Sequence, residues 1–252
     1  MRKLLIIGIG AGDPDYITIQ AINALNQVDV FFVIDKGEEK DDLVRLRKEL
    51  CRKYIRDQSF RIIEARDPER DRKAPAYATA VEDSYEKRAA IFEQMIVDEL
   101  AENGCGGFLV WGDPTLYDST IRIVELIRAA KRIDFDYEVI PGISSVQALV
   151  AKHKLPINRI GEAIHITTGR KLAEGLPPDI SNAVVMLDSQ NAYRGVDPEV
   201  EIYWGAYIGT ESEILISGKL RDVADVIEAT RAKARKEKGW IMDTYLLRYP
   251  QK

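Results

Sequence analysis

Trp111-Gly112-Asp113-Pro114-Thr115-Leu116-Tyr117 decides the fold of this chain together with Gly8-Ile9-Gly10-Ala11-Gly12-Asp13-Pro14. Each stretch follows an apolar run, residues 108–111 and 4–7 respectively. Such a run is typical of a buried parallel strand, and the polar residues after it mark the loop where the strand ends. In open α/β sheets ligands bind at this carboxyl edge, so both loops are predicted to line a ligand site.

Glycines at 8, 10 and 12 predict backbone that turns sharply and that a ligand can approach closely. A dinucleotide fingerprint places its third glycine three residues after Gly10, and that position is Asp13. A carboxylate there would repel a pyrophosphate at a helix start. The pattern therefore favours a nucleoside-like ligand that has no phosphates and can be cationic.

Three segments in register give the chain a family resemblance: GIGAGDPDYIT (8–18), WGDPTLY (111–117) and PGISS (141–145). With them the chain resembles the tetrapyrrole methylases, which use S-adenosylmethionine. Many relatives have proline where this chain has Ala11. The resemblance implies a two-domain α/β fold: a mostly parallel open sheet with helices, then an α+β domain with a mixed sheet, and an active site in the cleft between them.

The resemblance also implies cofactor contacts, because the family holds the methionine part of the cofactor with the Gly-Asp-Pro loop. The matching positions are Ala11, Trp111, Gly112, Asp113, Leu116, Ser144, Ser145, Leu187 and Tyr207. Simpler roles remain open for two of these groups. Asp113-Pro114 can form an ordinary turn, and Ser144-Ser145 can cap the following helix.

Within the family, residues 66–72 and 159–170 resemble corrin methylases that also release an acetyl group as acetate. Such a substrate carries many carboxylates, which guanidinium groups bind bidentately. Basic residues that follow predicted strands are therefore expected to bind substrate: Arg66, Arg70, Arg72, Lys73 and Arg170. The alternative is a solvated surface loop, because charge clusters usually lie on the surface.

Methyl transfer needs alignment of two reactants and exclusion of water more than acid–base residues. Deacetylation does need an activated water or a carboxylate. The sequence offers Asp13, Tyr117 and His165 as catalytic candidates, with Asp15 and Glu162 as further ones. His165 fits a buried structural histidine equally well. The other histidine, His153, is expected at the surface near a helix end.

Hydrophobic periodicity predicts strands that alternate with helices in the N-terminal part, which is typical of a parallel sheet. The predicted strands are 4–7, 30–34, 60–64, 108–111 and 137–140, and the helices are 18–26, 36–56, 81–103 and 119–131. After residue 140 strands dominate, which favours antiparallel pairing. These strands are 163–166, 183–187, 201–207, 214–216 and 241–247, with helices at 145–153 and 220–238. The predicted domains are 1–140 and 141–252.

Composition excludes several classes of protein. A formal net charge of −5 argues against a general nucleic-acid binder. Cys51 and Cys105 are the only cysteines, so neither a disulfide framework nor a zinc site is expected. No apolar run is long enough to span a bilayer, and the N-terminal run is too short for a signal peptide. We expect a cytoplasmic enzyme without a metal, and the family resemblance implies a homodimer.

Two other functions stay open at this point. A dinucleotide-binding oxidoreductase would use Gly8, Gly10 and Gly12 for a pyrophosphate and Asp35 for a ribose. A methylase of the same family could instead act on another corrin carbon or on a protein side chain.

Overall fold

The computed structural model describes residues 1–35, 41–57, 59–68 and 77–250. The chain divides into two compact units, each described by itself below. Unit 1 comprises Met1–Gly10 and Pro14–Ile143, and unit 2 comprises Ala11–Asp13 and Ser144–Lys252. This division of contacts falls three residues after the expected boundary. A boundary between independently folding domains at residue 140 stays a prediction.

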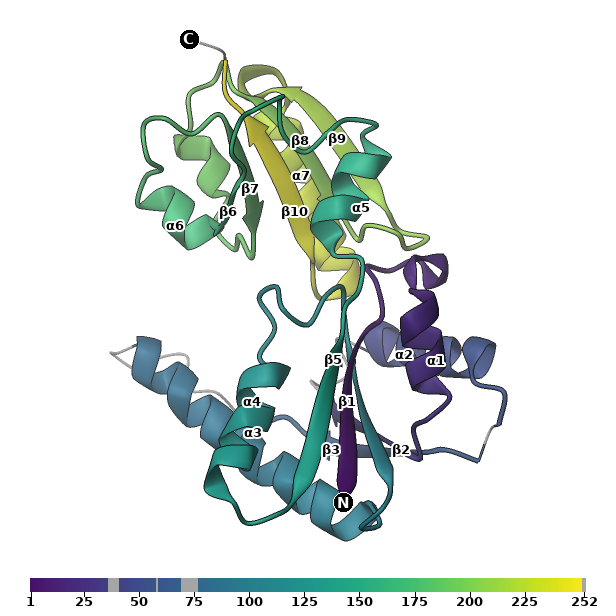
Figure 1. The fold of residues 1–252 in the computed structure, drawn as a ribbon. Coiled ribbons are helices and arrows are strands. Elements are labelled where there is room, and N and C mark those ends of the chain that lie inside the picture. Colours follow the sequence, from purple (N-terminus) through teal and green to yellow (C-terminus); the bar gives the residue numbers. More distant parts are fainter. Residues whose placement is uncertain (36–40, 58, 69–76, 251–252) are drawn as a thin grey trace. The chain divides into compact units, whose positions relative to one another are not determined.

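Unit 1 contains a parallel five-stranded sheet in the order β3-β2-β4-β1-β5, as the alternating pattern predicts (Figure 1). Its strands are β1 (Arg2–Gly8), β2 (Val30–Asp35), β3 (Arg61–Arg66), β4 (Cys105–Val110) and β5 (Phe135–Ile140). Strand β4 is central, and the interior strand β1 pairs with β4 and β5. Leu4, Leu5, Ile6 and Ile7 of β1 are all buried, because helices cover both faces of the sheet.

The helices of unit 1 are η1 (Pro14–Tyr16), α1 (Ile19–Leu25), α2 (Asp41–Tyr54), α3 (Tyr77–Glu99) and α4 (Thr120–Ala130). Leu5 and Ile7 share one core with residues of α1 and α2, whereas Leu4 and Ile6 share the other with residues of α3 and α4. Thr18 caps α1 as expected, its hydroxyl accepting the amide proton of Ala21 at 3.0 Å.

The bounds predicted for α3 are wrong by four residues at each end, although its buried face is correct. Phe92, Met95 and Ile96 are buried on the predicted stripe. The helix ends at Glu99 rather than at residue 103, because Gly104 closes a separate turn by donating to the Ala101 carbonyl at 2.9 Å.

Unit 2 contains a mixed sheet in the order β6-β7-β10-β8-β9. Its strands are β6 (His165–Thr168), β7 (Asn182–Met186), β8 (Glu201–Ala206), β9 (Ile214–Lys219) and β10 (Asp243–Arg248). Only β6 and β7 pair in parallel, and the other pairs are antiparallel as expected. The last strand in sequence, β10, lies in the middle of the sheet (Figure 1).

The helices of unit 2 are α5 (Ser145–Lys152), α6 (Gly169–Ala173), η3 (Ala192–Gly195) and α7 (Leu220–Lys238). The short α6 is absent from the sequence prediction. The core of unit 2 includes three fully buried aromatic side chains, Trp204, Tyr193 and Tyr245. None of the described helices is long and apolar enough to cross a membrane.

Candidate functional site at the strand ends

Four glycines bring the chain segments at the ends of β1, β4 and β5 into direct backbone contact. Gly10 and Gly112 form an isolated antiparallel bridge, in which the Gly112 amide donates to the Gly10 carbonyl at 2.8 Å. A Cβ on Gly142 would lie 2.1 Å from the Gly112 carbonyl oxygen, and one on Gly8 would lie 2.6 Å from the Gly142 nitrogen. No side chain fits at these positions, so the edge presents backbone rather than side chains.

Asp113 ties two of these loops together. One carboxylate oxygen accepts the Thr115 amide proton at 2.8 Å and also the Thr115 hydroxyl proton. The other accepts the Gly142 amide proton at 2.9 Å. Asp113 therefore forms a local Asx turn, as the alternative interpretation held, and also a tether to the 141–145 loop. Trp111 and Leu116 of the same loop are half-buried.

Three predicted site residues have left-handed backbone. Tyr117, Leu187 and Tyr207 have φ of 54°, 54° and 50°. Non-glycine residues adopt this conformation at a cost of roughly 1–3 kcal/mol, and such strain clusters at functional sites. Among the residues that the structure describes, the other non-glycine residues with positive φ are Lys131 and Lys154, which follow helices, and Asn191, a residue type that tolerates it.

The first glycine loop contributes residues 11–13 to unit 2, where they lie against the chain after β8. Gly12 has a φ of 97°, and a Cβ there would lie 2.3 Å from the Ile208 carbonyl oxygen. Ala11 is 1% exposed, so its methyl group faces the protein interior. Asp13 is half-buried.

Tyr207 and the serine pair have structural roles that the structure makes visible. The Tyr207 hydroxyl donates to the Trp240 carbonyl at 2.5 Å, and the ring packs edge-on against Trp240. Ser144 caps α5, its hydroxyl oxygen accepting the Val146 amide proton at 3.1 Å. Ser145 is half-buried, with its hydroxyl 3.4 Å from that of Thr244. The expected helix cap is thus confirmed at Ser144.

Comparison with known proteins matches residues 3–224 to the family model of the tetrapyrrole (corrin/porphyrin) methylases. The chain belongs to this family. It is 51% identical, over 98% of its length and 95% of the relative, to precorrin-6A synthase [deacetylating] from Sinorhizobium sp.

Solved structures agree with this assignment. A putative cobalamin synthesis related protein from Corynebacterium diphtheriae has a TM-score of 0.86 and 39% identity, with 98% of each chain covered. The uroporphyrin-III C-methyl transferase of Thermus thermophilus, complexed with S-adenyl homocysteine, has a TM-score of 0.58 at 17% identity. It covers 97% of this chain and 96% of its own, and it shares the fold.

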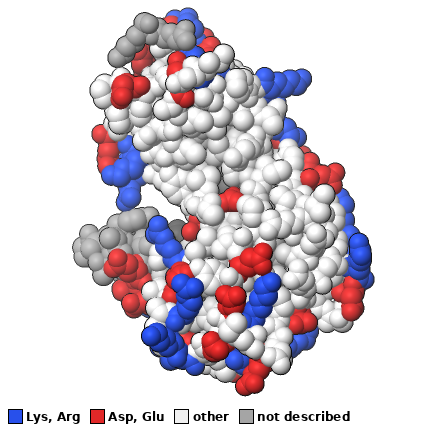
Figure 2. All heavy atoms as spheres, viewed as in Figure 1, with Lys and Arg blue, Asp and Glu red and all other residues white. Residues whose placement is uncertain are grey.

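The predicted substrate residues are only partly described. Arg66 ends β3 and Arg170 lies in α6 directly after β6, and both are exposed. Arg70, Arg72 and Lys73 lie outside the described residues. Over unit 1, the face drawn in Figure 2 has acidic and basic side chains interspersed, without a field of one sign.

The catalytic candidates are divided between the two units, with Tyr117 in unit 1 and Asp13 and His165 in unit 2. Tyr117 follows the Gly-Asp-Pro loop and is 46% exposed, and burial of its hydroxyl raises its pKa. His165 begins β6, pairing with Ala183, so the strand separates it from Arg170 at the other end. Glu162 accepts a proton from the Asn182 amide at 2.8 Å.

Asp15 and His153 also have protein partners. Asp15 bonds Lys53 at 2.8 Å and Tyr54, and these bonds hold its pKa below the usual range. His153 lies at the C-terminal end of α5, the helix end that was expected, and is half-buried there. Its ring packs edge-on against Tyr203, and its Nε2 lies 3.1 Å from the Trp204 carbonyl. Burial lowers the pKa of His153.

Arg47 at the strand ends was missed by sequence reasoning. Residues 36–56 read as a solvated amphipathic helix, yet Arg47 of α2 donates to the Leu109 carbonyl at 3.2 Å near the end of β4. Burial lowers its pKa, while Asp118 opposes that shift. No spacing marks this arginine among its charged neighbours. Among the described residues no His, Cys, Asp and Glu side chains group to hold a metal ion.

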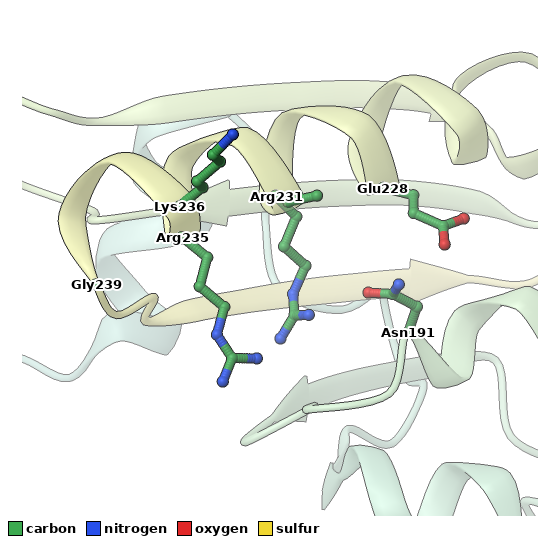
Figure 3. A pocket seen from close by; sticks show the side chains of 7 residues that line it. Asn191, Glu228, Arg231, Arg235, Lys236 and Gly239 are labelled. Carbon is green, nitrogen blue, oxygen red and sulfur yellow. The ribbon is translucent and has the colours of Figure 1, made fainter.

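A pocket of about 490 Å³ opens beside the C-terminal half of α7 (Figure 3). Its lining consists of Asn191, Glu228, Arg231, Ala232, Arg235, Lys236 and Gly239. Arg235 and Lys236 are exposed near the end of the helix, where cations interact favourably with the helix dipole. Arg231 differs from them, because it is buried and its guanidinium extends from α7 toward the loop that carries Asn191.

Proposed function

We propose that this protein is a precorrin-6A synthase of the deacetylating type, which methylates precorrin-5 at C1 and releases acetate. The observation that carries the proposal is the 51% identity to a protein of that name over nearly the whole of both chains. More distant relatives, such as the precorrin-2 C(20)-methyltransferase of Sinorhizobium sp at 27% identity, match less of the chain. The protein is a methyltransferase of cobalamin biosynthesis and uses S-adenosylmethionine.

The residues at the strand ends fit this cofactor. S-adenosylmethionine, when bound, supplies a sulfonium methyl on a nucleoside that has no phosphates. Glycine-lined backbone suits close approach of such a ligand, and Asp13 and Asp113 add negative charge. We keep as cofactor contacts Ala11, Trp111, Gly112, Asp113, Leu116, Ser144, Ser145, Leu187 and Tyr207. The buried Tyr207 ring leaves this residue its backbone for the contact.

The protein's part in methyl transfer is to align the ring carbon with the methyl group and to exclude water. In deacetylation the ring-to-acetyl carbon bond breaks, the oxygen of water joins the acetyl carbon, and the electron pair of the broken bond stays with the ring. Asp13, Tyr117 and His165 remain the proposed catalytic residues. A tyrosine hydroxyl is protonated at neutral pH, and partial burial raises the pKa of Tyr117 further, so its role would be to donate a hydrogen bond.

Substrate carboxylates are proposed to bind Arg66, Arg70, Arg72, Lys73 and Arg170. Support comes from their chemistry, because guanidinium groups bind carboxylates in two-bond pairs. Arg66 and Arg170 follow the ends of β3 and β6 and are exposed, as this role requires.

Product analysis tests the proposed reaction. Purified protein is incubated with precorrin-5 and S-adenosylmethionine labelled in the methyl group, with boiled protein as control. We expect a product that has gained one labelled methyl at C1 and lost its acetyl group, with one acetate per turnover. A label on another carbon without acetate favours a different methylase of the family. Tight NAD binding without S-adenosylhomocysteine binding in calorimetry favours the oxidoreductase and overturns the assignment.

We also propose that the protein is a cytoplasmic homodimer. The family resemblance motivates the dimer, and the absence of a disulfide framework in the sequence suits a reducing compartment. Light scattering at micromolar concentration should give twice the mass of one chain, and a monomer mass contradicts the dimer. Cell fractionation checks the compartment.

A further inference from the structure

The loop after β7 combines an exposed strained residue with a buried carboxylate. Leu187 has a φ of 54° and is 64% exposed, whereas the next residue, Asp188, is 5% exposed. Leucine rarely adopts this backbone conformation unless its surroundings impose it. Leu187 is a proposed cofactor contact, so whatever holds its conformation bears on cofactor binding.

Asp188 supplies that constraint, because all three of its oxygens accept hydrogen bonds. One carboxylate oxygen accepts the Gln190 amide proton at 3.0 Å, and the other accepts those of the Ala192 amide and the Tyr245 hydroxyl, each at 2.7 Å. The backbone carbonyl of Asp188 accepts a proton from the Arg231 guanidinium. The carboxylate and the carbonyl thus both fix the chain that leads from Asp188 toward residue 192. Leu187 lies between this anchored residue and the end of β7 at Met186, so its backbone is held from both ends.

Arg231 is itself held in place. Its Nε donates to Asp243 at 2.9 Å, and the Trp204 indole donates to the same oxygen at 3.0 Å. Figure 3 shows the Arg231 side chain leaving α7 on the side of the 187–192 loop. A Cβ added to Gly169 would lie 2.5 Å from the Asp188 carboxylate, so Gly169 packs closely against this side chain. Asp188 therefore has little space to take another rotamer.

We propose that Asp188 is a positioning residue for methyl transfer, which holds Leu187 in the left-handed conformation that receives the cofactor. The inference rests on the proposed function, since it assumes that Leu187 contacts S-adenosylmethionine. A purely stabilising network would leave cofactor affinity unchanged in any variant that still folds. A positioning role therefore predicts that a substitution changes the affinity for the cofactor, whereas a stabilising role predicts a change only in the free energy of unfolding.

The isosteric substitution Asp188→Asn tests the proposal, because an amide cannot accept bonds on both sides. Either the Gln190 amide or the Ala192 amide then faces an NH₂ group. We expect the dissociation constant for S-adenosylhomocysteine, measured by calorimetry, to rise about tenfold, the loss associated with one hydrogen bond to a charged group. Asn182→Ala is the matched control. Asn182 is buried at the opposite end of β7, so its loss should destabilise the fold but change affinity less than about twofold.

Making the same Asp188 substitution in a Leu187→Gly protein distinguishes a positioning role from a purely stabilising one. Glycine adopts positive φ readily, so Leu187→Gly should relieve the need for the constraint. In this background Asp188→Asn should raise the dissociation constant by less than about threefold. Equal affinity of parent and Asp188→Asn, or an undiminished loss in the Leu187→Gly background, overturns the proposal.

Two further outcomes are distinguishable from these. If Asp188→Asn does not fold, Tyr245→Phe removes one bond to the same carboxylate and should weaken binding about threefold. Unchanged affinity in that variant then overturns the positioning role. A parent protein that binds no S-adenosylhomocysteine overturns the proposed function itself.

Discussion

Replacing Asp113 by alanine should weaken cofactor binding and also loosen the strand-end loops. The carboxylate accepts the Gly142 amide proton at 2.9 Å and the Thr115 amide proton at 2.8 Å. Alanine removes both bonds and leaves the Gly142 amide without this partner. A cofactor contact alone would cost affinity and leave the fold intact, whereas the tether to Gly142 adds a cost in stability.

The magnitude follows from these bonds. A hydrogen bond to a charged group contributes about 1.5–3 kcal/mol. Asp113 is half-buried, so we expect a loss of about 2 kcal/mol in the free energy of unfolding. For a chain of this size such a loss lowers the melting temperature by roughly 4–8 °C. Poorer alignment of the two loops should raise the dissociation constant for S-adenosylhomocysteine about tenfold.

Calorimetry measures both quantities, and Asp57→Ala is the control. Asp57 also lies in unit 1 and accepts the Ser59 amide proton at 3.0 Å, in a turn of the same kind. Its loss should change affinity by less than about twofold. Asp113→Asn keeps one acceptor oxygen, so its melting temperature and its affinity should lie between those of the parent and of the alanine variant. An Asp113→Ala protein with the melting temperature and affinity of the parent refutes the reasoning.

Three further predictions concern packing, pH and substrate. Gly142→Ala should lower the free energy of unfolding, measured with a chemical denaturant, by more than about 3 kcal/mol, because its Cβ would lie 2.1 Å from a carbonyl oxygen. Gly195→Ala is the control and should cost less than about 1 kcal/mol, because the space around Gly195 is open. Burial raises the pKa of Cys51 from 9.0 to about 12, so this thiol stabilises the fold below pH 9 and loses that contribution as the pH rises toward 12. Between pH 8 and 11 the free energy of unfolding should decline less steeply with pH in Cys51→Ala than in the parent, by up to about 1.4 kcal/mol per pH unit. Parallel curves of the two proteins would contradict burial of the thiol as the cause. Replacing Arg70 and Arg72 together by alanine should weaken tetrapyrrole binding, less so in high salt, with S-adenosylmethionine affinity nearly unchanged; equal tetrapyrrole affinity would favour the solvated loop.

Much of the fold could be predicted because apolar runs and helical stripes are local signals. The run at residues 4–7 predicts a buried strand, and β1 is an interior strand with all four of these residues buried. The ends of α3 could not be predicted, since periodicity defines the buried face of a helix but not its last turn. The five-residue α6 was missed because it is too short to show a period.

The candidate site divides in a similar way. Glycine and Asp-Pro patterns located the strand-end loops, because the need for backbone without a Cβ is visible in sequence. The partners of Asp113 were not visible, since Gly142 is distant in sequence. Asp188 and Arg231 were missed for the same reason: their contact depends on how β7 and α7 pack.

The central position of β10 has a consequence for synthesis of the chain. Neighbours β7 and β8 pair with β10 and not with each other, so their facing edges have no partner until residues 243–248 leave the ribosome. Unpaired strand edges are sites of aggregation. Nascent chains of this protein should therefore expose these two strand edges until β10 has been made, and a ribosome stalled before residue 243 would hold a unit 2 whose sheet cannot close.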